Sequence, residues 1–263
     1  MSIITISRGS YSSGKEIAEK VAAKLGYECV DRDALLDASN QFDISEIKLI
    51  KAIHDAPSIL DRFTHGKEIY VSYIQAALLK MVQKDNVVYH GLAGHFFLKD
   101  ISHVLKLRII ADFEDRVTNE MRRENVSREE AGRLLKKDDQ ERVKWSQYLY
   151  GIDTMDSSLY DLVIHIKTLS IDDAVKLICN TVQFDRFKTT QKSQRKLDDL
   201  VIASSVKAEL VQIAPYARVT CLNGRVNVHF RVHEDWDEKL VGELEKSMKA
   251  VEGVISINMD LNM

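Results

Sequence analysis

The chain opens with Ile3-Ile4-Thr5-Ile6-Ser7-Arg8-Gly9-Ser10-Tyr11-Ser12-Ser13-Gly14-Lys15. Its β-branched start favours a strand, and the pattern G-x-x-x-x-G-K that follows is typical of a phosphate-binding loop. Ile17, Val21 and Leu25 then recur at helical spacing. In this order of strand, loop and helix, backbone N–H groups surround phosphate oxygens, and the helix N-terminus and the lysine add positive charge. The sequence therefore predicts a nucleotide-phosphate site.

We expect this loop to hold the phosphates of a nucleoside triphosphate, with Lys15 on the outer ones. The residues concerned are Gly9, Ser10, Tyr11, Ser12, Ser13, Gly14, Lys15 and Glu16. Glu16 stands where many such loops have a Ser or Thr that contacts Mg²⁺, so the metal ligands stay undetermined. The alternative interpretation is a Gly/Ser-rich turn with a surface lysine.

Composition limits the class of protein. A chain of 263 residues with 45% hydrophobic residues suggests one large or two modest domains. Its net charge of −3 argues against nucleic-acid binding. The three cysteines lie far apart and no apolar stretch reaches the length of a membrane span, so we expect reduced thiols and no transmembrane segment. Because the N-terminus also lacks a signal-peptide pattern, we expect a cytoplasmic protein.

Short apolar runs alternate with helical segments up to about residue 184. The strand-like runs are residues 3–7, 28–30, 86–90, 104–111 and 162–166, and residues 43–83 and 113–150 have helical patterns. Helix N-terminal signals stand at Ser127-Arg128-Glu129-Glu130 and at Ser170-Ile171-Asp172-Asp173. Such alternation predicts a three-layer α/β/α fold with a parallel sheet, whose ligands bind at the carboxyl ends of the strands.

The amino-acid composition of the chain changes after residue 184. Residues 185–196 are polar and basic, which indicates a linker or an exposed helix extension. After them the pattern is helix, strand, strand, helix, strand, and Asn223-Gly224 is a hairpin signal between the first two strands. We therefore predict three segments: a first domain at residues 1–184, a linker at 185–196, and a small α+β domain at 197–263 that folds alone.

Several polar residues fall at predicted strand ends. Asp31 and Arg32 follow the second strand and are placed to bind an acceptor substrate, although helix capping with a solvated arginine is the alternative. His90 and His95 flank two glycines after the third strand, where backbone can approach a ligand, although a structural role for each histidine is the alternative.

Residues 113–150 are rich in Arg and Lys, among them Arg116 and Arg142. Phosphoryl transfer needs cations around the moving group, and a helical flap that carries them also excludes water when it closes. A few of these side chains are candidates for that role, and a solvated helix surface explains the rest.

Together these motifs resemble the cytidylate kinase-like family of P-loop nucleoside monophosphate kinases over residues 1–180. The resemblance is carried by Ile4-Thr5-Ile6-Ser7-Arg8 with Gly14-Lys15-Glu16-Ile17-Ala18, and by Asp31-Arg32. It continues in Asp139-Gln140-Glu141-Arg142 with Tyr148-Leu149-Tyr150-Gly151, and in Tyr160-Asp161-Leu162-Val163-Ile164. In the family an arginine opens the flap helices, as Arg116 does here.

The resemblance implies ATP-dependent phosphoryl transfer, with Mg²⁺, to a nucleoside monophosphate such as cytidine monophosphate. It implies that Lys15, Arg116, Asp139 and Arg142 are catalytic. Asp31, Arg32 and Gly91 would bind the acceptor. The family's third strand normally ends in Gly-Arg, and here Leu92 follows Gly91, which removes a bidentate contact to the acceptor phosphate.

Residues 197–263 resemble a BON domain in their Asn223-Gly224-Arg225-Val226 hairpin and their Val251-Glu252-Gly253-Val254 turn. The resemblance implies association with membranes or partner proteins. In a chain that we expect to be cytoplasmic, it favours a regulatory, ligand-sensing or oligomer-forming role over binding of outer-membrane lipid. The sequence thus leaves two functions open. The first is a nucleoside monophosphate kinase, and the alternative is a nucleotide-binding regulatory protein that signals through this domain.

Overall fold

The computed structural model describes residues 2–9, 12–31, 64–91, 94–231 and 238–262. By its contacts the chain divides into two compact units. The first comprises Met1–Ala34 and Lys84–Thr189, and the second comprises Leu35–Gln83 and Thr190–Met263. Each unit is described by itself.

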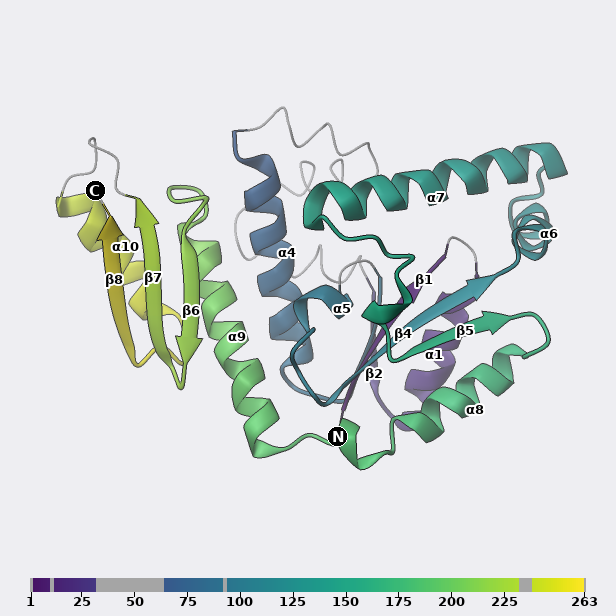
Figure 1. The fold of residues 1–263 in the computed structure, drawn as a ribbon, viewed down its shortest axis with the longest axis horizontal. Helices are drawn as coiled ribbons and strands as arrows, with labels where there is room; N and C mark the ends of the chain where they lie inside the picture. Colours follow the sequence, from purple (N-terminus) through teal and green to yellow (C-terminus); the bar gives the residue numbers. More distant parts are fainter. Residues whose placement is uncertain (1, 10–11, 32–63, 92–93, 232–237, 263) are drawn as a thin grey trace. The chain divides into compact units, whose positions relative to one another are not determined.

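The first unit is built on a five-stranded sheet with the order β2-β3-β1-β4-β5 (Figure 1). Every neighbouring pair in it is parallel, which confirms the predicted sheet. The strands are β1 (Ile3–Arg8), β2 (Glu28–Asp31), β3 (Val87–His90), β4 (Val104–Ala111) and β5 (Leu162–Ile166). The strand that leads into the phosphate loop is central, so its carboxyl end lies between β3 and β4.

Helices cover both faces of this sheet. On one face Ile4, Ile6 and Leu107 pack into a buried core with α1 (Gly14–Leu25) and α8 (Ile171–Thr181). Successive strand residues point to opposite faces, so Thr5 and Tyr89 point to the other face. There α5 (Gly94–Phe97) begins so close to them that an added Cβ at Gly94 would lie 2.5 Å from the Tyr89 ring.

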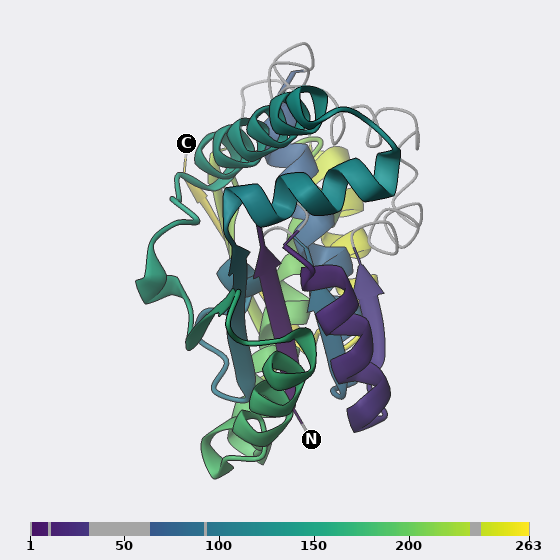
Figure 2. The same cartoon turned by 90° about the vertical axis from the view of Figure 1, so that its right-hand side faces the viewer.

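Two helices lie beyond the carboxyl ends of the strands: α6 (Phe113–Glu124) and α7 (Arg128–Tyr150) (Figures 1 and 2). α7 begins where the Ser127 hydroxyl accepts a hydrogen bond from the Glu130 N–H, and a full capping box of Ser170 and Asp173 begins α8. Both helix starts were predicted. A 3₁₀ turn (Ser157–Leu159) then leads into β5.

The second unit contains the predicted small C-terminal sheet. Its strands β6 (Arg218–Leu222), β7 (Arg225–Arg231) and β8 (Ser256–Asn262) follow the order β6-β7-β8. β6 and β7 are antiparallel around the Asn223-Gly224 turn, and β7 and β8 are parallel. One face packs on α9 (Gln191–Leu210) and α10 (Glu238–Ala250) through a core that includes Val206, Val228 and Met248.

The segment predicted as a linker or an exposed helix extension contains the boundary between the two units, which falls after Thr189. Residues 185–187 form a 3₁₀ turn, and α9 begins at Gln191 after a Thr190 cap. α4 (Gly66–Val82), which we placed in the first domain, contributes Tyr73 and Ala76 to a cluster with Ala208 and Val211. The second unit therefore takes in α4, because the apolar side chains of that helix find partners on and after α9. Residues 43–63 of the predicted helical segment lie outside the described residues.

Among the described residues, no helix is both long enough and apolar enough to cross a membrane. Cys29, Cys179 and Cys221 are free thiols, as their spacing predicted.

Candidate active site

The described residues of the predicted phosphate loop are tied to the neighbouring strand β4. The Gly9 N–H donates to the Ile109 carbonyl at 3.1 Å, and the Ser12 hydroxyl lies within hydrogen-bond distance of the carbonyls of Gly9 (3.0 Å) and Ile109 (3.1 Å). Ser12 therefore anchors the loop with its side chain. Ser13 has a left-handed backbone with φ of 63° and precedes α1 without a side-chain cap. Ser10 and Tyr11 lie outside the described residues.

A cleft of about 680 Å³ opens over the start of α1, and we call it the loop cleft. Ser13, Gly14, Lys15 and Glu16 form its floor. Its other lining residues are Arg8, Glu19, Asn119, Glu120, Arg123, Asp138, Arg142 and Ile171.

The loop cleft carries charges of both signs. Lys15 is well exposed there, at 59% of its side-chain surface, and its Nζ lies 3.8 Å from Glu19. Glu120 is buried and pairs with Arg123 at 3.0 Å, and burial raises its pKa although Arg123 opposes that shift.

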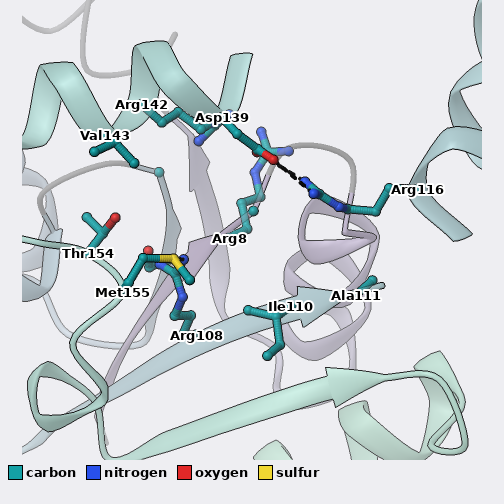
Figure 3. A pocket seen from close by; sticks show the side chains of 13 residues that line it. Arg8, Arg108, Ile110, Ala111, Arg116, Asp139, Arg142, Val143, Thr154 and Met155 are labelled. Atoms are coloured by element: carbon teal, nitrogen blue, oxygen red, sulfur yellow. Dashed lines mark hydrogen bonds and ion pairs between the residues drawn. The ribbon is translucent and has the colours of Figure 1, made fainter. Parts of the chain in front are cut away.

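A second cleft of about 280 Å³ lies beside the loop, and we call it the arginine cleft (Figure 3). Its described lining residues carry four guanidinium groups and a single carboxylate, that of Asp139. Its lining is Ser7, Arg8, Gly9, Gly91, Arg108, Ile110, Ala111, Arg116, Asp139, Arg142, Val143, Thr154 and Met155. Arg8 and Arg142 line both clefts, so the two clefts adjoin at these side chains.

Two of the predicted catalytic residues are brought together here. Arg116 on α6 donates from both terminal nitrogens to the two carboxylate oxygens of Asp139 on α7, at 3.0 and 2.8 Å. The Arg116 side chain is only 11% exposed and lies against Gly9 of the loop. The bidentate pair holds the guanidinium in one orientation.

Arg108 is a residue that the sequence analysis missed. It lies on β4, is 8% exposed, and turns away from the core that takes up Leu107 and Ile109. One terminal nitrogen donates to the Tyr160 hydroxyl at 3.3 Å and the other to the Met155 sulfur at 2.9 Å. A charged residue inside an apolar strand run was the available signal, since period-two alternation sends its side chain to the other face.

Of the remaining predicted binding residues, one lines a cleft, one does not, and one lies outside the described residues. Gly91 lines the arginine cleft, and its N–H donates to the Ile6 carbonyl at 3.2 Å. Asp31 ends β2 beside His90 but lines neither cleft. Arg32 and Leu92 lie outside the described residues.

Both histidines near the third strand are buried. Burial is the main cause that lowers the pKa of His90, and burial together with the charge of Arg108 lowers the pKa of His95 to about 3. The His95 ring lies 4.7 Å from that of Tyr160. At neutral pH His95 is therefore an uncharged ring behind Tyr160.

Known proteins resemble this chain in sequence and fold. It is 26% identical to a cytidylate kinase of Sulfolobus acidocaldarius over 66% of this chain and 91% of the relative. It is 27% identical to a cytidylate kinase of Archaeoglobus fulgidus over 72% of this chain and 99% of the relative.

A crystal structure of an uncharacterized protein from Eubacterium ventriosum shares the fold, with a TM-score of 0.54, at 19% identity over 69% of this chain and 98% of that one. The sequence profile of the Cytidylate kinase-like family matches residues 3–168. The chain therefore belongs to the cytidylate kinase-like family.

Proposed function

We propose that this protein transfers a phosphoryl group from ATP to a nucleoside monophosphate or a related small acceptor. The observation that carries the proposal is the pair of adjoining clefts that share Arg8 and Arg142. One cleft lies over a phosphate loop and the other is lined by arginines. A donor and an acceptor bound in them would meet at the shared guanidinium groups.

We assign a role to each residue from its position in the two clefts. Lys15 and the loop N–H groups hold the donor phosphates in the loop cleft. Arg116 and Arg142 neutralise the charge of the transferring group, and Asp139 keeps Arg116 in place. Phosphoryl transfer depends on such positioning and charge stabilisation, because the protein has little covalent chemistry to perform.

We propose that Mg²⁺ binds together with the donor ATP. It binds one or two carboxylates and completes its shell with substrate phosphates and water. Glu16 and Asp138 are carboxylates of the loop cleft that suit this role. A bound Mg²⁺ would offset the negative charge of the donor phosphates.

We propose cytidine monophosphate as the first acceptor to test, because two relatives are cytidylate kinases. We also propose that residues 197–263 form a BON-like module that binds a partner protein or a second copy. Within the second unit α4 packs against this module, because Tyr73 and Ala76 form a cluster with Ala208 and Val211.

ADP release tests the proposed reaction. The full-length protein is incubated with ATP, Mg²⁺ and each of the cytidine, uridine, adenosine and guanosine monophosphates, with Lys15→Ala as the inactive control. We expect one acceptor to be turned over on the order of 1–100 times per second. ATP binding without acceptor-dependent ADP release would overturn the proposal and favour a regulatory protein.

A further inference from the structure

We infer that Arg108 binds the phosphate group of the acceptor in the arginine cleft, and so replaces the arginine that the family pattern has at position 92. This inference rests on the proposed function, because it names the anchor of the acceptor in that same site.

Arg108 is buried without a carboxylate partner among the described residues. Its guanidinium has a phenol and a thioether as hydrogen-bond acceptors, and it lies 5.7 Å from the centre of the Tyr160 ring. A buried guanidinium is normally paired with an anion, since its desolvation is costly. Tyr160 and Met155 orient the Arg108 guanidinium but do not neutralise its charge, so an anionic ligand can pair with it.

Among the described residues that line the cleft, the one carboxylate is that of Asp139, and it is engaged elsewhere. Arg8, Arg116 and Arg142 add positive charge, and both oxygens of Asp139 already accept hydrogen bonds from Arg116. The ligand that suits this lining is an anion with several acceptor oxygens, because an arginine fork matches phosphate geometry.

The position of Arg108 suits the acceptor rather than the transferring group. Arg116 lies against Gly9 of the loop, whereas Arg108 is the register partner of Ser7 in β1, two residues before the loop. Figure 3 shows Arg108 with Thr154 and Met155 on one side of the cleft, apart from the Arg116–Asp139 pair. A phosphate on Arg108 would therefore lie away from the phosphate loop.

The side chains behind Arg108 hold it in this orientation. The Tyr160 hydroxyl lies 3.0 Å from the Thr154 carbonyl and 3.3 Å from the Ser7 hydroxyl, and it accepts from Arg108. The ring of the uncharged His95 supports Tyr160 from behind. An anchored guanidinium loses little freedom when a phosphate arrives, which favours binding.

The experiment compares Arg108→Met with Arg122→Met, an exposed arginine of α6 that lines neither cleft. Calorimetry measures the binding of the four nucleoside monophosphates named above, their phosphate-free nucleosides and ATP. We expect Arg108→Met to weaken binding of the preferred monophosphate about 10- to 100-fold, the scale of hydrogen bonds to charged groups. Binding of the nucleoside and of ATP should stay unchanged, and Arg122→Met should match the wild type.

Two further measurements guard against a folding artefact. The ligand-free Arg108→Met protein should melt no lower than the wild type, because the substitution removes a buried charge that has no counter-ion in the described part of the chain. Arg108→Lys should restore part of the preference for the monophosphate over the nucleoside, since it keeps the charge and loses the fork.

The outcomes separate this inference from the proposed function. A wild type that binds monophosphate and nucleoside equally, or an Arg108→Met protein that keeps the preference, would overturn the role of Arg108 even if ADP is released. Arg108-dependent binding of a monophosphate without ADP release would support the anchor and overturn the kinase.

Discussion

Lys15 and Arg108 carry the same charge in opposite surroundings. The Lys15 side chain is 59% exposed, so its charge is solvated and available to a ligand that arrives from the loop cleft. Arg108 is 8% exposed and fixed by neighbours from later in the chain. The first residue is identified by its motif, and the second only by its environment.

Lys15→Ala should weaken ATP binding by about 1.5–3 kcal/mol, because it removes a charged donor to the outer phosphates. Titration calorimetry measures this change directly. Lys24→Ala is the matched control, since Lys24 is exposed in the last turn of the same helix and lines neither cleft. Equal ATP affinity in the Lys15→Ala and Lys24→Ala proteins would contradict a phosphate-binding loop.

His95 should make folding stability depend on pH. Its pKa falls from the ordinary 6.5 to about 3 on folding, so the unfolded chain binds a proton between these values that the folded chain does not. The contribution of His95 to the free energy of unfolding is therefore fully present above pH 6.5. It is lost as the pH falls, by about 2 kcal/mol between pH 7 and pH 5.

Urea unfolding of the wild type and of His95→Gln at pH 7 and pH 5 measures this contribution. The variant should lose about 2 kcal/mol less stability than the wild type over that interval, because glutamine does not titrate. The same pH dependence in both proteins would show that His95 is not protected from protons in the folded state.

Among the elements, the turn after β3 and the start of α5 pack tightly on Tyr89, and Gly91 of this turn lines the arginine cleft. Gly94 begins α5 against the buried Tyr89, and Gly91 packs on the same ring from the preceding turn. Neither glycine has a positive φ in the structure, so close approach explains them better than backbone strain. The sequence predicts a ligand-binding loop at these two glycines. In the structure an added Cβ at either one would lie 2.5 Å from Tyr89, and Gly91 also lines the arginine cleft.

Gly94→Ala should destabilise the protein by about 1–3 kcal/mol, since its Cβ would lie 2.5 Å from a ring that is 1% exposed. Gly132→Ala in α7 is the matched control, because its nearest neighbour would be Phe113 at 3.9 Å. That control should gain about 0.5–1 kcal/mol from helix propensity. Denaturant midpoints measure both, and a Gly94→Ala protein as stable as the control would contradict the packing.

For the whole molecule, the second unit contains more of the chain than the predicted C-terminal domain, because it also takes in Leu35–Gln83. We expected residues 197–263 to fold alone, but α4 buries Tyr73 and Ala76 with Ala208 and Val211. Gln83 and Asp198 add a side-chain hydrogen bond of 2.9 Å between the same two segments. A cut before α9 therefore separates partners within one compact unit.

A fragment of residues 1–189 should accordingly expose the apolar face of α4. We expect it to bind a hydrophobic dye and to self-associate, whereas the full chain should do neither. Dye fluorescence and sedimentation of the fragment and the full chain measure this. A monomeric fragment that binds no dye and keeps ATP affinity would instead support the original division at residue 184.

The sequence predicts the five strands of the first sheet, the helix starts at Ser127 and Ser170, and the Asn223-Gly224 hairpin, and the structure confirms each of them. These features depend on residues close together in the chain: side-chain periodicity, capping groups and turn-forming residues. Residues 185–196 were harder, because a polar tract suits both a linker and the exposed face of a helix such as α9.

Only the tertiary structure decided which distant residues meet. Arg108 donates hydrogen bonds to Met155 and Tyr160, 47 and 52 positions later, and α4 packs with Ala208 and Val211, more than a hundred residues away. Periodicity tells which face of an element is apolar, but not which other element covers that face or which charge is left without a counter-ion. Those depend on the order of strands in the sheet and on the packing of helices, where the free energy comes from contacts between segments far apart in the chain.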